Sequence, residues 1–149
     1  MDNIQDVMEF VIPSDFKFLG PVDAAIQDLA REFSCSQDCV NDVSTAIIEA
    51  CSNAIEHGNK FSREKRINVL IKFNGQSICA RICDQGDGFD FDKRLSESNP
   101  PDAQSERGRG LIIMKAFTDE LKFTNEPKKG FCVELKKCRS NENSSDEAE

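Results

Sequence analysis

The chain has 149 residues and a mass of 16.7 kDa, which suits a single ordinary domain. Its formal net charge is −8. Because binding to a phosphate backbone requires clustered Lys and Arg, no direct nucleic-acid binding is expected. The longest unbroken apolar run, 111–114, has four residues. This is far fewer than the roughly 18 that span a bilayer, so no membrane partner is expected either.

The N-terminus and the cysteines bear on the cellular compartment. The first basic residue is Lys17, so the N-terminus lacks the charged and apolar regions of a secretory signal and a cytoplasmic protein is expected. The seven Cys residues are odd in number and show no C-x-x-C spacing. This pattern favours reduced core thiols over disulfides or a zinc site.

The first half of the chain predicts one strand and two helices. Residues 7–12 read as a strand that Pro13 ends. A helix with Pro21 at its start follows. Its buried face is spaced at i, i+3 and i+4 and consists of Val22, Ala25, Ile26, Leu29, Ala30 and Phe33. A second helix is expected from a cap at Ser36 to a stop at Gly58. Its buried stripe consists of Val40, Val43, Ile47, Ala50, Cys51 and Ala54.

The second half predicts a hairpin, a long loop, a helix and two strands. Residues 67–73 and 78–82 alternate between apolar and polar around the turn dipeptide Asn74-Gly75. The next apolar-poor stretch, about 92–107, is expected to be a mobile or functional loop because of its length. A third helix is predicted from Gly108-Arg109-Gly110, and the closing strands are predicted at 121–124 and 131–135.

The order β-α-α-β-β-loop-α-β-β predicts an α+β fold. We expect a two-layer sandwich in which helices cover one face of an antiparallel or mixed sheet. Residues 1–139 are expected to form this one domain. Residues 140–149 carry four acidic groups and no basic one, so they are expected to be a disordered, solvated tail.

Three motifs carry candidate chemistry, and the first is on the second helix. At about 100° per residue, Glu49, Asn53 and His57 lie beside the buried stripe and not on the solvent side. A half-buried carboxylate and amide one turn apart suit a hydrated divalent cation or the orientation of a hydroxyl. Taken alone, they equally suit hydrogen bonding to a neighbouring loop. His57 is expected to pack, and Glu56 to be solvated.

The second motif, Asp84-x-Gly86-x-Gly88, directly follows an apolar strand. Glycines permit a tight turn and a close approach to a flat ligand. The carboxylate is able to accept a hydrogen bond from an exocyclic amine. In isolation, an ordinary Asp/Gly turn is the alternative explanation.

The third motif is Gly108-Arg109-Gly110 at a helix start. The free N–H groups and the helix dipole there favour an anion, and Arg107 and Arg109 add positive charge. The sequence contains no G-x-x-x-x-G-K P-loop and no G-x-G-x-x-G or H-R-D signature of protein kinases.

In this order, with a long loop between the second and third, the motifs resemble the N box, G1 box, ATP lid and G2 box of the GHKL ATPase superfamily. The segments 48–58 (IEACSNAIEHG) and 108–114 (GRGLIIM) most closely resemble the bacterial anti-sigma factor serine/threonine kinases. The resemblance covers about residues 8–137 and implies the Bergerat ATP-binding fold.

The resemblance also implies ligands and residue roles. ATP and Mg²⁺ would bind, with Asn53 holding the metal. Asp84 would bind the adenine amine, which selects ATP over GTP because guanine presents a carbonyl there. Gly86 and Gly88 would shape the adenine pocket. Family members commonly have Thr after the Gly at position 130, where it helps to line the base pocket, and this chain has Phe131.

The phosphates and the phosphoryl acceptor have implied partners as well. The segment Arg107, Gly108, Arg109 and Gly110 would bind phosphate behind the lid. Glu49 would be the general base for a Ser or Thr hydroxyl. A Glu carboxyl is already ionised at pH 7, so Glu49 would orient the hydroxyl and accept its proton late.

The implied function is an ATP-dependent anti-sigma protein. It would sequester a sigma factor, phosphorylate Ser or Thr of an anti-anti-sigma antagonist of the STAS type, and form a homodimer. Two alternatives stay open: a nucleotide-gated binding switch without kinase activity, and a histidine-kinase-like ATP domain that acts on another chain. Glu49 disfavours the last one, because sensor histidine kinases usually carry Asn there.

Overall fold

The structure is a computed structural model that describes residues 6–86, 106–126 and 130–139, with the backbone alone at 106–109 and 126. Five antiparallel strands form one sheet in the order β1-β2-β3-β5-β4. The strands are β1 Asp6–Pro13, β2 Arg66–Phe73, β3 Ser77–Cys83, β4 Glu120–Glu126 and β5 Gly130–Cys138. The helices are α1 Leu19–Glu32, α2 Gln37–Asn53 and α4 Glu106–Ala116, preceded by a short 3-10 turn, η1 Phe16–Phe18.

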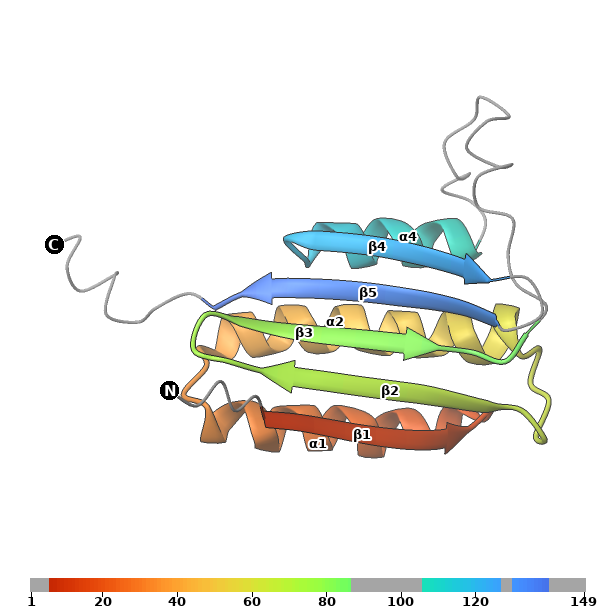
Figure 1. The fold of residues 1–149 in the computed structure, drawn as a ribbon, viewed down its shortest axis with the longest axis horizontal. Coiled ribbons are helices and arrows are strands. Elements are labelled where there is room, and N and C mark those ends of the chain that lie inside the picture. The colour runs from red at the N-terminus through yellow and green to blue at the C-terminus, as the bar shows by residue number, and fades with distance from the viewer. Residues whose placement is uncertain (1–5, 87–105, 127–129, 140–149) are drawn as a thin grey trace, which may run out of the picture.

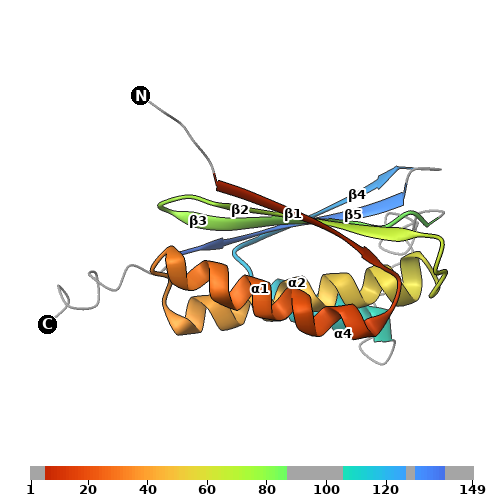
Figure 2. The ribbon, with the colours of Figure 1, turned by 90° about the horizontal axis from the view of Figure 1, so that it is seen from below.

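The three helices lie side by side on one face of the sheet, with α2 between α1 and α4 (Figures 1 and 2). The α+β two-layer prediction is therefore confirmed, and the sheet is wholly antiparallel among the described strands. The core fills the space between the layers because each strand alternates between a buried and a solvent-facing side. Buried strand residues are Ile12, Ile67, Val69, Ile71, Phe73, Ile78, Ala80, Ile82, Phe131, Val133 and Leu135.

The second helix follows its predicted pattern until its last turn. Ser36 caps it by accepting a hydrogen bond from the Cys39 N–H at 3.2 Å, and every residue of the predicted buried stripe is buried. The helix does not continue in α form to Gly58. It passes at Ala54 into one π-helical turn, η2 Ala54–Gly58, whose wider backbone lets Asn59 N–H donate to Ala54 O at 2.8 Å.

The cysteine prediction is wrong for two of the seven residues. Cys83 and Cys132 are register partners on β3 and β5 and form a disulfide, with their Cα atoms 4.1 Å apart. The other five Cys residues are not in a disulfide. A spacing rule overlooks this pair because 49 residues separate its members and only the strand register brings them together.

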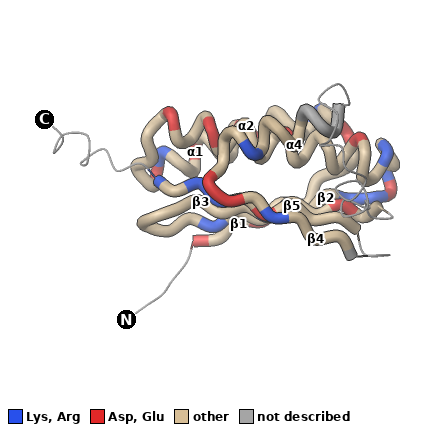
Figure 3. The backbone as a smooth tube through the Cα atoms, turned by 90° about the horizontal axis from the view of Figure 1, so that it is seen from above, with Lys and Arg blue, Asp and Glu red and all other residues tan. Residues whose placement is uncertain are grey.

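The structure also bears on the predicted boundaries of the third helix, the lid and the tail, and it shows how charged residues are distributed. Helix α4 begins at Glu106, two residues before the predicted Gly108. The predicted lid at 92–107 lies almost entirely outside the described residues, and the predicted acidic tail lies wholly outside them. Lys and Arg positions alternate with Asp and Glu positions along the described backbone, as the colours of Figure 3 show. No helix among the described residues is both long and apolar enough to cross a membrane.

Candidate functional site

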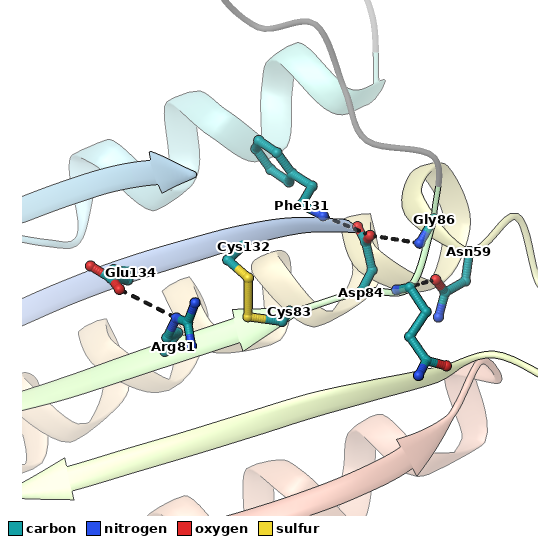
Figure 4. The surroundings of a disulfide bond; sticks show 9 residues. Asn59, Arg81, Cys83, Asp84, Gly86, Phe131, Cys132 and Glu134 are labelled. Carbon is teal, nitrogen blue, oxygen red and sulfur yellow. Dashed lines mark hydrogen bonds and ion pairs between the residues drawn. A yellow bond between two sulfur atoms is a disulfide. The ribbon is translucent and has the colours of Figure 1, made fainter. Parts of the chain in front are cut away.

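Asp84 forms the centre of a tightly packed turn at the end of β3 (Figure 4). The residue is 2% exposed, and its Oδ1 accepts hydrogen bonds from the backbone N–H groups of Gly86 and Phe131, both at 3.0 Å. The other carboxylate oxygen, Oδ2, is buried and has no hydrogen-bond partner within the described part of the chain. Because buried carboxylate oxygens are ordinarily hydrogen-bonded, Oδ2 can take a donor from a ligand.

Three glycines surround this carboxylate so closely that no side chain fits at their positions. A Cβ atom on Gly58 would lie 1.9 Å from Asp84 Oδ2, and one on Gly86 would lie 2.1 Å from the Gly58 carbonyl oxygen. Gly130 has φ +112° and contacts the Asp84 backbone, so it needs glycine for its conformation as well as for space. The sequence pattern identified Gly86, but it did not identify the other two.

Asn59 ties this turn to the rest of the fold, and the sequence interpretation missed it. The residue is 2% exposed. Its Oδ1 accepts from the Gln85 backbone N–H at 2.7 Å, and its Nδ2 donates to Ser14 Oγ at 2.9 Å and to Arg66 O at 3.0 Å. Gln85 Oε1 in turn accepts from the Arg66 N–H at 2.6 Å. The only sequence signal was an Asn after Gly58, which is also typical of a simple helix end.

Asn53 is the last residue of α2 and lies against the start of α4. It is 7% exposed, and its amide nitrogen Nδ2 is buried without a hydrogen-bond partner among the described residues. A Cβ on Gly110 would approach that nitrogen to 2.7 Å and Oδ1 to 3.1 Å. Gly110 therefore allows α4 to pack onto the amide, which brings the first and third sequence motifs together.

Glu49 lies one helical turn before Asn53 and is half-buried. It lines a groove of about 500 Å³ between α1 and α2, together with Asp23, Asn41, Ser44 and other residues. Its carboxylate is thus next to a surface channel, whereas Asn53 faces α4.

Other predicted site residues are only partly placed. Gly88 lies outside the described residues, and the side chains of Arg107 and Arg109 are not described. Gly108 is within the first four residues of α4, whose N–H groups have no partner inside the helix. Gly110 is the fifth, so its role in packing against Asn53 is the better supported one.

Three further residues lie close to Asn53 in the sequence. His57 Nε2 lies 3.8 Å from a carboxylate oxygen of Glu56, with both side chains roughly 30% exposed, so Glu56 is less solvated than predicted. Complete burial raises the pKa of the Cys51 thiol to about 12, so this cysteine beside Asn53 is unreactive at neutral pH.

The residues present fit a magnesium nucleotide. A buried carboxylate oxygen of Asp84, which has no partner in the described ranges, lies among closely packed glycines, and this suits the amine of a flat base. No group of three or more His, Cys, Asp or Glu side chains in the described ranges has the geometry to hold a metal ion. A magnesium ion held through Asn53 would therefore depend on phosphate oxygens and water for its other ligands, as Mg²⁺ commonly does.

Named proteins are similar to this chain over most of its length. The chain is 27% identical over 131 residues to a protein named serine-protein kinase RsbW from Bacillus subtilis, covering 84% of this chain and 82% of that protein. It is 29% identical to an anti-sigma F factor from Clostridium beijerinckii, with 87% and 91% covered.

A solved structure has the same fold. It contains the RsbU and RsbW domains of Rv1364c from Mycobacterium tuberculosis and matches with a TM-score of 0.66 and 18% identity. The match covers 90% of this chain and 32% of the other, so the chain spans about a third of that protein's length. Residues 12–137 match the model of the histidine kinase-like ATPase domain. This chain therefore belongs to the histidine kinase-like ATPase domain family.

Proposed function

We propose that this protein is a cytoplasmic, ATP-dependent serine/threonine kinase that also binds and restrains a sigma factor. Its phosphorylation substrate would be an anti-anti-sigma protein of the STAS type. The names of the relatives, serine-protein kinase and anti-sigma F factor, support the two halves of this proposal. A homodimer is proposed on the family resemblance alone.

The buried carboxylate of Asp84 carries the nucleotide part of the proposal. Its Oδ1 is already held by two backbone N–H groups, which fixes the orientation of the carboxylate, and its Oδ2 has no partner among the residues that the structure describes. An exocyclic amine offers the hydrogen bond that Oδ2 lacks, whereas the carbonyl of guanine would place a second acceptor against it. We therefore propose that Asp84 selects adenine over guanine, with Gly86 and Gly88 shaping the surrounding turn.

Asn53 and the start of α4 are proposed to hold the phosphate end. Asn53 would hold Mg²⁺ together with the phosphates, and Mg²⁺ there would neutralise negative charge on them. The free N–H groups of α4, including that of Gly108, favour an anion. The cationic side chains of Arg107 and Arg109 and the close packing of Gly110 complete the proposed phosphate site.

Glu49 is proposed as the general base. In the transfer, the hydroxyl oxygen of the substrate Ser or Thr forms a bond to the γ-phosphorus while the bond to ADP breaks. Glu49 orients that hydroxyl and accepts its proton late in the transfer. Its place at the edge of the α1–α2 groove gives a protein segment access to it.

The test combines a binding and a labelling experiment. Calorimetry should show Mg-ATP binding more tightly than Mg-GTP, and Asp84→Asn should weaken ATP binding by about 1.5–3 kcal/mol, the value of a charge-assisted hydrogen bond. Equal affinity of the wild type for ATP and GTP would remove the proposed role of Asp84.

Incubation with γ-labelled ATP and candidate STAS proteins tests the chemistry. Acid-stable phosphate on the STAS protein supports the kinase. Binding without any transfer would indicate a nucleotide-gated switch, and acid-labile phosphate would indicate transfer to His.

A further inference from the structure

We propose that Cys83 and Cys132 form a reversible disulfide that controls the nucleotide site, through thiol–disulfide exchange with a small-molecule disulfide such as oxidised glutathione. The inference rests on the proposed nucleotide-binding function. The structural observation behind it is the position of the pair, one residue away from both partners of the Asp84–Phe131 contact (Figure 4).

The pair is the last register pair of β3 and β5 at the end of the sheet that carries Asp84. Beyond this pair, two hydrogen bonds join the segments that adjoin β3 and β5. Asp84 N–H donates to Phe131 O, and Phe131 N–H donates to Asp84 Oδ1, each at 3.0 Å. The ends of paired segments open more readily than their centres. A covalent link at this last pair therefore acts directly on the hydrogen bond that orients the Asp84 carboxylate.

The strand geometry allows the two thiols to react with each other. The Cα atoms are 4.1 Å apart, close to the spacing of a non-hydrogen-bonded antiparallel pair, at which side chains approach most closely. Both residues are partly exposed and lie on the sheet face opposite the helices, since their neighbours Ile82 and Val133 are buried. A small solute reaches them without unfolding the core.

Three of the other cysteines show by contrast what this arrangement requires. Cys39 and Cys51 are buried, and Cys79 faces Lys136 across the sheet, so its opposite residue is not a thiol. Cys79 lies four residues before Cys83 on β3 and is also partly exposed. It is therefore a matched control for a change of Cys on the same strand and face.

The exchange is balanced in atoms and electrons. The thiolate of one cysteine attacks the S–S bond of the small disulfide, which breaks and releases one thiolate. The thiolate of the second cysteine attacks the mixed disulfide, forms the Cys83–Cys132 bond and releases the second small thiolate. The protein loses two electrons and two protons, and the small disulfide is reduced to two thiols.

The oxidised form is expected to bind the nucleotide more tightly. With the bond present, the last pair cannot open, so Phe131 N–H stays on Asp84 and the carboxylate is held in its binding orientation. With the bond reduced, a fraction of molecules has this contact open, and the apparent affinity falls in proportion to the competent fraction. We expect a decrease of about fivefold.

The first experiment measures affinity of the full chain for a non-hydrolysable Mg-ATP analogue in oxidised and in reduced glutathione buffers. The wild type and Cys79→Ser should bind about fivefold more tightly when oxidised. Cys83→Ser and Cys132→Ser should show the weaker affinity in both buffers. Thermal unfolding of each variant verifies that it is folded. The comparison of wild-type affinity between the oxidised and the reduced buffer does not depend on any variant.

The second experiment uses the reciprocity of linked equilibria. If oxidation strengthens binding fivefold, saturating nucleotide must lower the reduction potential of the disulfide by about 21 mV, because a tenfold change corresponds to 29.6 mV for two electrons. Redox titration with mass-spectrometric readout of the Cys83–Cys132 linkage measures this. Failure of the linkage to form in excess oxidised glutathione, or equal affinity in the two states, overturns the proposal.

A third readout separates this inference from the proposed function. Without nucleotide, amide hydrogen exchange at Phe131 should be slower in the oxidised protein than in the reduced one, while exchange at the opposite end of the sheet is unchanged. If the chain binds no nucleotide in either state, the proposed function fails. Equal Phe131 exchange in both states would refute control of the Asp84 turn by the disulfide.

Discussion

An asparagine side chain holds a turn at each end of the sheet, but the two ends differ in whether buried polar atoms are left without a hydrogen bond in the described structure. At the end where β2 turns into β3, Asn74 Oδ1 accepts from the N–H groups of Gln76 and Ser77 at 2.7 and 2.8 Å. Arg139 Nη1 donates to Asn74 O at 2.8 Å. At the other end, Asn59 plays the corresponding part and holds the turn after β3.

The difference lies in what each Asn supports. The Asn74 turn satisfies its own polar groups and closes a hairpin. The Asn59 turn presents Asp84, whose Oδ2 is buried without a partner in the described structure, and Asn53 Nδ2 at the end of α2 is in the same condition. Since an unpaired buried polar atom costs about 1–3 kcal/mol, such atoms indicate an end of the molecule that is adapted to a ligand.

The largest expected effect concerns catalysis at the ligand end. Glu49→Gln keeps the size and hydrogen-bonding reach of the side chain but removes proton acceptance. We therefore expect the phosphorylation rate of the protein substrate to fall by about 10²-fold or more, with little change in ATP affinity. Single-turnover phosphorylation and ATP titration, run in parallel, measure the two quantities.

Glu56→Gln is the control for this change. Glu56 is a partly exposed carboxylate at the same end of α2, close to His57, so its neutralisation should leave the rate unchanged. A wild-type rate in Glu49→Gln would mean that Glu49 is not the base, and the proposed kinase mechanism would have to be abandoned.

The next effect tests the two asparagine turns against each other. Asn59→Ala removes the acceptor of Gln85 N–H and leaves buried partners unsatisfied, so it should lower ATP affinity about tenfold through the adjoining Asp84 turn. Asn74→Ala removes the oxygen that accepts from the N–H groups of Gln76 and Ser77 and from Ser77 Oγ. It should lower the thermal midpoint without changing ATP affinity. Calorimetry and thermal unfolding of both variants separate positioning from stability. Equal loss of affinity in both would contradict the contrast drawn between the two ends.

The helix layer and the strands could be predicted because their signals are local. The stripe on α2 from Val40 to Ala54 and the alternation in β2 and β3 follow from periods of 3.6 and 2 residues. The Asn74-Gly75 turn has its own sequence signature. The choice between an antiparallel and a mixed sheet could not be made, since strand order depends on contacts between distant segments.

The site was predictable only in part, because several of its residues act through contacts between segments that are distant in the sequence. Asn53 and Asp84 belong to short motifs with recognisable spacing. Gly58, Asn59 and Gly130 matter because each touches a segment far away in the chain, and none has a neighbouring residue that signals this. The disulfide was mispredicted because the pairing of Cys83 with Cys132 depends on the register of β3 against β5.

The smallest expected effect compares two helical glycines. A Cβ on Gly110 would lie 2.7 Å from Asn53 Nδ2, whereas a Cβ on Gly20, in the first turn of α1, would meet no atom within 4 Å. Both changes to Ala favour the helix by up to about 1 kcal/mol. In Gly110→Ala the Asn53 amide has to move away from the new Cβ, which should lower the Mg-dependent affinity for nucleotide about threefold. Gly20→Ala should raise the thermal midpoint and leave that affinity unchanged.

Titration of ATP with and without Mg²⁺ on both variants measures the difference. If Gly110→Ala binds Mg-ATP as tightly as Gly20→Ala does, close packing of α4 on Asn53 is not what positions the amide proposed to hold the metal. The Asn53 Nδ2, which lacks a partner in the described structure, would then belong to the helix interface and not to the ligand site.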